Sequence, residues 1–369
     1  LDAQGAARVV ILLNPPDTQI RSLQARNQSL AQTQVRLLAS VTARDFQLIH
    51  RYQTVSGLVG KVTPQGLAQL RRSPDIRSIA LDMPVYPATL ESAVLIRADR
   101  VWNDLGITGD GVRIAVIDSG IDMEHPDVSK DVLAQHCFTQ GACLPSESNE
   151  GVYAQDQHGH GTRIAGIITG EGIASPRGIA PDAEIVAVRV MDQMGMGWAS
   201  DVVAGIDWIV ANQALYNIKI INLSLGGGMY QGTCDTTDAN TMLYADALTA
   251  AHNAGIVIFA ASGNQGQRDA MIAPACISHA ISVGCTYDAN LGGRNWGVCT
   301  DISTNVDQIA CFSNSDATLD LLAPGAWTET TALGGGKNGD AGTSTATAHV
   351  SAVAALMLQA NPTLTPDQI

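Results

Sequence analysis

The chain has 369 residues, of which 46% are hydrophobic and 15% are charged, a composition typical of a globular protein with a sizeable core. No run of about 18 apolar residues occurs, so we expect no membrane-spanning helix. The net charge of −14 is distributed unevenly, because residues 1–88 contain 10 Lys/Arg and 5 Asp/Glu whereas residues 89–369 contain 11 and 30. The acidic body argues against nucleic acid as its main partner. The basic front segment and the acidic body are expected to attract each other, unless the acidity serves solubility alone.

The first 88 residues have the pattern of a small α+β domain. Short apolar runs indicate strands, and a Gln-rich stretch has apolar residues near helical spacing. Strands are predicted at residues 7–13, 46–52, 58–62 and 76–81, and helices at 18–44 and 64–72. The order β-α-β-β-α-β is typical of a ferredoxin-like fold. Residues 83–92 contain two prolines and no periodicity, which predicts a linker.

From residue 89 onward, continuous apolar runs alternate with helical segments. Such runs indicate strands buried on both faces, here at residues 112–117, 184–190, 218–223, 256–261, 280–283 and 319–322. Helices are predicted at 160–169, 199–212, 239–253 and 344–359. The alternation predicts an α/β fold, a doubly wound and mostly parallel sheet with helices on both faces. The last residues, Leu-Thr-Pro-Asp-Gln-Ile369, have the pattern of a starting helix, from which we expect residues 89–369 to form a domain clipped at its end.

The seven cysteines favour disulfides over metal binding, because no C-x-x-C or Cys/His zinc spacing occurs. Disulfides would place the protein in an oxidising compartment. Cys137 and Cys143 bracket a short polar loop and form one candidate pair, and Cys234 with Cys276 forms another. Buried free thiols are the alternative for each pair. The remaining cysteines include at least one that is unpaired, and the sequence does not decide which: Cys285, Cys299 or Cys311.

Three separated motifs contain a carboxylate, a base and a nucleophile: Val-Ile-Asp118-Ser-Gly, Gly-His160-Gly-Thr and Gly-Thr-Ser344-Thr-Ala. A serine hydroxyl needs a histidine to accept its proton and a carboxylate to orient that histidine. Asp118 directly follows a predicted strand, and His160 and Ser344 each open a predicted helix. All three can therefore meet at the carboxyl edge of the sheet. Taken alone, Asp118 could cap a turn and Ser344 could cap a helix.

These motifs and their order, Asp then His then Ser, resemble the subtilisin-like serine protease family from about Val94 onward. The resemblance implies an endopeptidase that cleaves proteins through an acyl-enzyme and needs no cofactor for its chemistry. Ser344 would be the nucleophile, His160 the base and acid, and Asp118 the residue that orients the histidine. A weaker likeness of residues 52–82 to the inhibitory propeptides of this family implies that residues 1–88 are an intramolecular inhibitor. The protein would then be a self-processing zymogen.

The family resemblance also implies roles for residues around the triad. Asn264, in Ala-Ala-Ser-Gly-Asn264, would stabilise the oxyanion of acyl transfer. Ala273–Pro274 is a candidate cis peptide. An apolar, uncharged pocket lining implies a preference for apolar substrate residues. The residues implied to bind the substrate form two short segments: Ser224, Leu225 and Gly226, and Ala261, Ser262 and Gly263.

Several nearby residues match the family's pattern only in part. Asp127 is a possible calcium ligand by resemblance, although residues 169–177 lack the asparagine-rich sequence that completes that site. Of the other histidines, His158 is expected to be a loop residue, and His125 and His349 to support the site. Three positions depart from the usual family residues, and none of the departures removes a catalytic group: Arg163 for His, Thr345 for Met and Ala348 for Pro.

We therefore expect a secreted, monomeric serine endopeptidase that acts on proteins and has no nucleic-acid or membrane partner. The first alternative is a catalytically idle relative that acts as a binding protein, which would usually have lost a triad residue. The second is a lipase or esterase, whose nucleophile motif has Gly two residues after the serine. That position is Ala346 here, which disfavours the second alternative.

Overall fold

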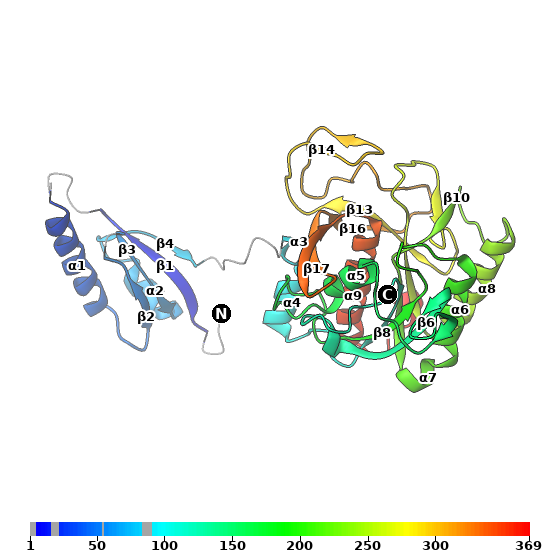
Figure 1. The fold of residues 1–369 in the computed structure, drawn as a ribbon. Coiled ribbons are helices and arrows are strands. Elements are labelled where there is room, and N and C mark those ends of the chain that lie inside the picture. The colour runs from blue at the N-terminus through cyan, green and yellow to red at the C-terminus, as the bar shows by residue number, and fades with distance from the viewer. Residues whose placement is uncertain (1–4, 16–21, 54, 83–90) are drawn as a thin grey trace. The chain divides into compact units, whose positions relative to one another are not determined.

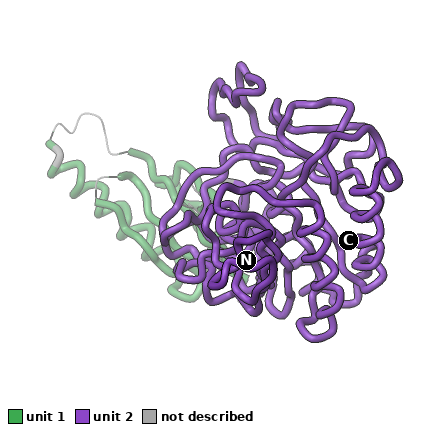
Figure 2. Tube along the Cα trace, turned by 45° about the vertical axis from the view of Figure 1, so that its right-hand side comes forward, with its two compact units in different colours: residues 1–86 green, residues 87–369 purple. Residues whose placement is uncertain are grey.

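The computed structural model describes all residues except 1–4, 16–21, 54 and 83–90, and it divides the chain into two compact units, residues 1–86 and 87–369 (Figures 1 and 2). Most of the predicted linker, residues 83–92, lies outside the described residues. Among the described helices, none is long and apolar enough to cross a membrane.

The first unit is a four-stranded antiparallel sheet with two helices packed on one face. Alternate residues of the central strand β1, Val9, Ile11 and Leu13, form a core with Leu30 of α1 and Leu70 of α2. Its elements are β1 (Ala7–Leu13), α1 (Leu23–Ala39), β2 (Phe46–Arg51), β3 (Gly57–Val62), α2 (Pro64–Leu70) and β4 (Ile76–Leu81). The strand order is β2-β3-β1-β4, with every neighbouring pair antiparallel. This arrangement agrees with the predicted ferredoxin-like order.

The second unit is built on an eight-stranded sheet of order β16-β13-β11-β9-β5-β8-β6-β7. Only the β6–β7 pair is antiparallel, and every other neighbouring pair is parallel. The strands are β5 (Arg113–Asp118), β6 (Val132–Cys143), β7 (Ser148–Gly151), β8 (Glu184–Arg189), β9 (Ile218–Leu223), β11 (Val257–Ala261), β13 (Ile281–Tyr287) and β16 (Leu321–Ala326). The chain leaves β8 and crosses β5 to reach β9, so the strand order reverses at β5. Ligand sites of open parallel sheets lie at such a reversal, beyond the carboxyl ends of the strands.

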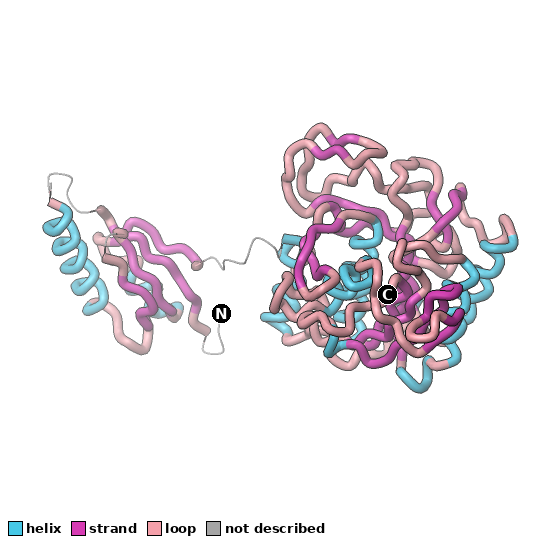
Figure 3. Tube along the Cα trace, in the orientation of Figure 1, coloured by secondary structure: helices cyan, strands magenta, loops and turns pink. Residues whose placement is uncertain are grey.

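Helices cover both faces of this sheet, as Figure 3 shows. On β5, Ile114 and Val116 pack against a core that includes residues of α5 (His160–Thr169) and α9 (Thr343–Ala360). The intervening residues, Ala115 and Ile117, pack on the opposite face against α6 (Ala199–Ala211) and α8 (Ala239–Asn253). Burial of consecutive residues on opposite faces explains the continuous apolar runs of the sequence. The predicted doubly wound α/β fold is confirmed.

Smaller elements complete the second unit. The hairpin of β17 (Thr328–Ala332) and β18 (Gly336–Asp340) leads directly into α9, and β10 (Gly227–Tyr230) pairs with β12 (Met271–Ala273). The remaining elements are α3 (Glu91–Leu95), α4 (Ala98–Leu105), α7 (Gln213–Tyr216), β14 (Arg294–Asn295), β15 (Thr300–Asp301) and two 3₁₀ turns, η2 (Ser129–Asp131) and η3 (Pro366–Gln368). The predicted helix start at the chain end is therefore only the short turn η3.

Three disulfides stabilise the loops of the second unit. Cys137–Cys143 and Cys234–Cys276 form as predicted. The third disulfide joins Cys299 to Cys311 and leaves Cys285 as a buried free thiol on β13. This identifies the unpaired cysteine, which the sequence left undecided.

Candidate active site

Asp118 and His160 meet where β5 ends and α5 begins. Asp118 is fully buried as the last residue of β5, and its two carboxylate oxygens lie 2.8 and 3.0 Å from Nδ1 of His160. Because a carboxylate can only accept, Nδ1 donates, and Nε2 is left as the free nitrogen of the neutral ring. The approach of the two segments requires glycine at position 161, where a Cβ atom would lie 2.1 Å from the Gly120 carbonyl oxygen.

The environment of His160 favours its protonated form. Burial opposes the charge, but the charge and hydrogen bond of Asp118 outweigh burial, and the pKa of His160 is raised. Asp340 contributes in the same direction, whereas Arg163 opposes it. A base whose pKa is raised accepts a proton more readily, which suits proton abstraction from a hydroxyl.

A buried carboxylate that sequence reasoning missed holds the turn before His160. One Asp156 oxygen accepts from the backbone N–H groups of His158 and Gly159, at 2.9 and 2.8 Å. The other oxygen accepts from the N–H and hydroxyl of Thr162. Asp156 also accepts from Ser119, the residue after Asp118. Its signal in the sequence is an acid placed just before a helix start, a position where carboxylates accept from orphan N–H groups.

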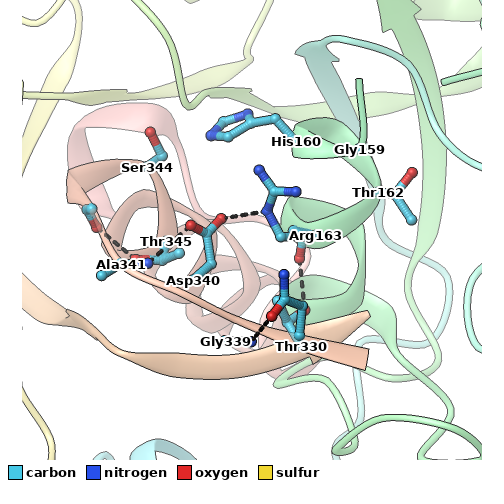
Figure 4. A network of polar contacts seen from close by, with 12 residues as sticks. Gly159, His160, Thr162, Arg163, Thr330, Gly339, Asp340, Ala341, Ser344 and Thr345 are labelled. Carbon is cyan, nitrogen blue, oxygen red and sulfur yellow. Dashed lines mark hydrogen bonds and ion pairs between the residues drawn. The ribbon is translucent and has the colours of Figure 1, made fainter. Parts of the chain in front are cut away.

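Ser344 lies in the first turn of α9, on the same side of the sheet as α5. Its hydroxyl donates to the Ser224 carbonyl at 2.9 Å, and within the described residues no hydrogen bond joins it to His160. Figure 4 shows the hydroxyl and the imidazole ring on facing sides of the same space. Catalytic hydrogen bonds are often absent without substrate and form in the substrate complex. The Ser224 hydroxyl donates in turn to the Ser344 carbonyl at 2.8 Å and fixes this turn.

Asn264 follows β11 and is held against the start of α9. Its amide oxygen accepts from the backbone N–H of Thr343 at 2.8 Å and lies 3.1 Å from the Thr343 hydroxyl. The side chain is exposed, and its NH₂ nitrogen lies beside Gly342, 3.1 Å from where a Cβ atom of that residue would stand. A fixed amide donor beside a candidate nucleophile has the properties of an oxyanion-binding group.

The two predicted substrate segments lie on either side of this turn. Leu225 and Gly226 lie between β9 and β10, and in the described part of the chain their backbone groups form no loop or turn hydrogen bond. They can therefore pair with an extended chain, as an exposed strand edge does. On the other side, Ser262 is anchored through its hydroxyl to the Asn314 carbonyl, and Gly263 through its N–H to the Thr343 hydroxyl. The Ala273–Pro274 peptide is cis, as predicted.

A cavity of about 550 Å³ adjoins the first segment. Leu225 and Gly226 line it together with Met196 and Trp198. Met196 and Trp198 are 68% and 65% exposed, so the cavity has a large apolar rim. The apolar residues of its lining can contact an apolar side chain of a bound peptide.

The structure does not support calcium binding by Asp127. This carboxylate is fully buried and accepts from the N–H groups of Ile173, Ala174 and Ser175 and from the Ser175 hydroxyl. A calcium ligand needs its oxygens free to face the cation, whereas here donor hydrogens surround them. The contact between Ser175 and Asp127 could not be predicted from the asparagine-poor sequence of this loop. Groups of three or more metal-ligating side chains are absent from the described residues.

The remaining predicted positions surround the site without entering it. His125 is buried, donates to the Gly336 carbonyl and accepts from the Asp127 N–H. His349 is buried in α9 and lies 2.8 Å from the Thr345 carbonyl, and burial lowers its pKa to about 4. Thr345 and Ala348 are fully buried. The His158 ring lies 6.4 Å from that of His160, centre to centre.

Comparison with known proteins gives one consistent result. Residues 109–369 match the Subtilase family. The Extracellular serine proteinase of Thermus sp. (strain Rt41A) is 34% identical over 328 residues, which cover 85% of this chain and 68% of that protein. Subtilisin E of Bacillus subtilis (strain 168) is 31% identical over 325 residues, which cover 86% of this chain and 74% of that protein.

Solved structures agree. Sphericase superimposes with a TM-score of 0.58 at 28% identity, covering 71% of this chain and 81% of that one. A cold-adapted subtilisin-like serine proteinase gives 0.52 at 29% identity, covering 71% and 80%. The chain therefore belongs to the Subtilase family and is a subtilisin-type serine endopeptidase, a hydrolase that acts on proteins.

Proposed function

We propose that Ser344, His160 and Asp118 are the catalytic triad of this endopeptidase. The observation that carries the proposal is the Asp118–His160 hydrogen bond of 2.8 Å at the sheet edge where α9 brings in Ser344. His160 Nε2 takes the Ser344 proton as the hydroxyl attacks the scissile carbonyl, and then gives it to the leaving amine. Asp118 holds the ring in the tautomer this needs. Water then releases the acyl group by the same route, and no cofactor takes part.

Negative charge on the carbonyl oxygen is stabilised by two donors. These are the NH₂ group of Asn264 and the backbone N–H of Ser344. The first turn of α9 adds the positive end of the helix dipole. Removal of one side-chain donor of this kind costs about 10²–10³ in kcat, a magnitude established for a member of this same family.

The substrate is an extended polypeptide with apolar side chains near the scissile bond. Its backbone pairs with the segment Ser224, Leu225 and Gly226, and the residue before the scissile bond lies against Ala261, Ser262 and Gly263. A further apolar side chain enters the cavity bordered by Trp198 and Leu225. Candidate substrates are therefore proteins rich in apolar residues rather than strongly basic ones.

Residues 1 to about 88 act as an inhibitory propeptide that is removed by self-processing. The match to the M-protease of Shouchella clausii covers 92% of this chain, more than residues 87–369 can supply, so it extends into the first unit. Ser92 and Ala93 are buried within the second unit, so the cut falls before them. We place the cut in the predicted linker of residues 83–92, ahead of Ser92. The mature enzyme is a secreted monomer, consistent with three disulfides and with extracellular relatives.

Two experiments test these assignments. Ser344→Ala should keep the fold, lower turnover by roughly 10⁶ and prevent labelling by a fluorophosphonate probe. Retention of a tenth of the activity would refute the triad. An unlabelled, inactive wild type would instead favour an idle binding protein, and cleavage of long-chain esters in preference to casein would favour an esterase.

The propeptide is tested separately. Purified residues 1–88 added to mature enzyme should inhibit it at micromolar concentration, and less strongly at high salt, because the charges of the two segments are screened. Absence of inhibition in low salt would contradict the proposal while leaving the triad untouched.

A further inference from the structure

An ion pair connects the helix that carries His160 to the segment that carries Ser344. Arg163 lies three residues after His160 on α5, so both side chains are on the same helix face. Its Nε donates to Asp340 at 2.7 Å, and both side chains are 21% exposed. Asp340 is the last residue of β18, four residues before Ser344, and Figure 4 shows it between the two helices.

Both partners of the pair are held by further contacts. The second Asp340 oxygen accepts from the Ala341 N–H at 2.9 Å, so the carboxylate is fixed at its own turn. The Thr330 hydroxyl donates to the Arg163 carbonyl at 2.8 Å. The hairpin β17–β18 therefore contacts the first turn of α5 through backbone and side chain. A pair fixed in this way keeps its geometry better than an exposed ion pair, whose ordering costs side-chain entropy.

We propose that Arg163 and Asp340 are positioning residues for the base: their ion pair fixes α5 against the Ser344 segment and balances two opposite charges beside His160. The proposal rests on the proposed function, because it assumes that His160 is the base. Neither residue touches the reacting atoms. Because the two opposite charges are held together, neither the Arg163 cation nor the Asp340 anion acts by itself on the His160 imidazole.

The charged and titratable groups that face His160 come from four elements. They are Asp118 from β5, His158 from the turn before α5, Arg163 from α5 and Asp340 from β18. Asp340 raises the pKa of His160 and Arg163 lowers it, so the two effects oppose each other. Removing one partner leaves the other unbalanced. Removing both restores the balance but loses the bridge between α5 and β18.

The proposal predicts opposite pH effects for the two single substitutions. In Asp340→Asn, the acid limb of kcat/KM for an uncharged peptide substrate should move to lower pH, and in Arg163→Gln to higher pH. Unit charges a few ångströms away shift a partly buried pKa by roughly 0.5–1 unit. The double variant should return the limb close to the wild-type position and keep a lowered kcat. Asp340→Glu, which keeps the charge, should retain the wild-type limb.

A matched control exists at the other end of the same sheet. Arg113 donates to Glu184 at 2.9 Å, with side chains 28% and 38% exposed. Arg113 begins the strand that Asp118 ends, so it lies about 16 Å from the site. Arg113→Gln should leave the acid limb and kcat unchanged, and titration with a fluorophosphonate corrects every variant for its folded fraction.

Each outcome of these experiments supports or overturns a named hypothesis. Limb shifts of opposite sign that cancel in the double variant support the proposal. If both single variants lose kcat equally and the acid limb does not shift, the pair is purely structural and the proposal is wrong. A change of KM confined to substrates with a basic leaving group would make Asp340 a substrate-binding residue, and also overturns it. If His160→Ala remains active, the proposed function itself fails, which separates the two hypotheses.

Discussion

Asp131 provides a sharp test of how burial sets the stability of this enzyme. It closes the turn η2 before β6 and is only 9% exposed, and its Oδ2 atom has no hydrogen-bond partner within the described residues. Burial and, to a smaller extent, the charge of Glu171 raise its pKa to about 7, although a hydrogen bond with Thr169 opposes the shift. The charge of Lys130 also opposes the shift, but the Lys130 ammonium group is paired with Glu171 at 2.5 Å.

The sign and size of the effect follow from linkage. The folded-state pKa of about 7 lies above the ordinary aspartate value of 3.8, so the folded state holds the proton more tightly. The contribution of Asp131 to the free energy of unfolding is fully present below pH 3.8 and is lost as the pH rises toward 7. At 1.36 kcal/mol per unit of pKa, the loss reaches about 4 kcal/mol above pH 7. Asn has the same shape as Asp but does not ionise, so Asp131→Asn should remove this pH-dependent loss of stability.

The assay is calorimetric unfolding of Ser344→Ala protein, which cannot digest itself, with and without Asp131→Asn. At pH 8.5 the second substitution should raise Tm by on the order of 8 °C, since 1 kcal/mol corresponds to about 2 °C in large domains. At pH 4 the two proteins should unfold within about 1 °C of each other. Asp104→Asn, at a carboxylate that is 60% exposed, should change neither value. A gain that is equal at both pH values, or a loss at pH 8.5, would refute the reasoning.

The remaining predictions concern single buried groups. Thr345→Met should make the enzyme sensitive to millimolar peroxide, because a sulfoxide beside the nucleophile is bulky and polar; equal inactivation rates in the two proteins would contradict this. Asp127→Asn should lower the free energy of unfolding by about 2–4 kcal/mol, because the Asn NH₂ group donates where the carboxylate accepted from backbone N–H groups. The drop in Tm should be identical in EDTA and in calcium. Asp156→Asn should lower kcat at least about tenfold without abolishing fluorophosphonate labelling, since it loosens the turn before the base. Because burial lowers the pKa of His349 to about 4, stability should fall between pH 6.5 and 4, and His349→Gln should flatten that fall in acid unfolding curves.

The sequence predicted the architecture well because its signals are local. A strand buried on both faces must be apolar throughout, and β5, β8, β9 and β11 each have such a run. The motif residues could be proposed from the sequence because each directly follows a predicted strand or opens a predicted helix. The sequence did not predict β6 and β7 of the main sheet, the short strands β10 and β12, the helices α3, α4 and α7, or the β14–β15 ladder and the β17–β18 hairpin.

The contacts that could not be predicted join residues far apart in the chain. Arg163 and Asp340 are 177 positions apart, and neither residue alone signals the pair. The contacts of Asp127 are a similar case, since its oxygens accept from backbone N–H groups 46–48 residues away, which the calcium interpretation did not foresee. A sequence shows which side chains can bind a cation, but it does not show whether hydrogen-bond donors from distant parts of the chain occupy those side chains in the folded protein.

The arrangement of α5 and α9 gives a physical reason why the proposed triad needs a carboxylate beside its base. Both helices begin at the same sheet edge, and each directs the positive end of its dipole into the site. At α9 this field favours the developing oxyanion. At α5 it disfavours a positive charge on His160, which must nevertheless form in the proposed proton transfer. Asp118 lies at that helix start and offsets the field through a direct hydrogen bond, so the same geometry can stabilise both charges of the transition state.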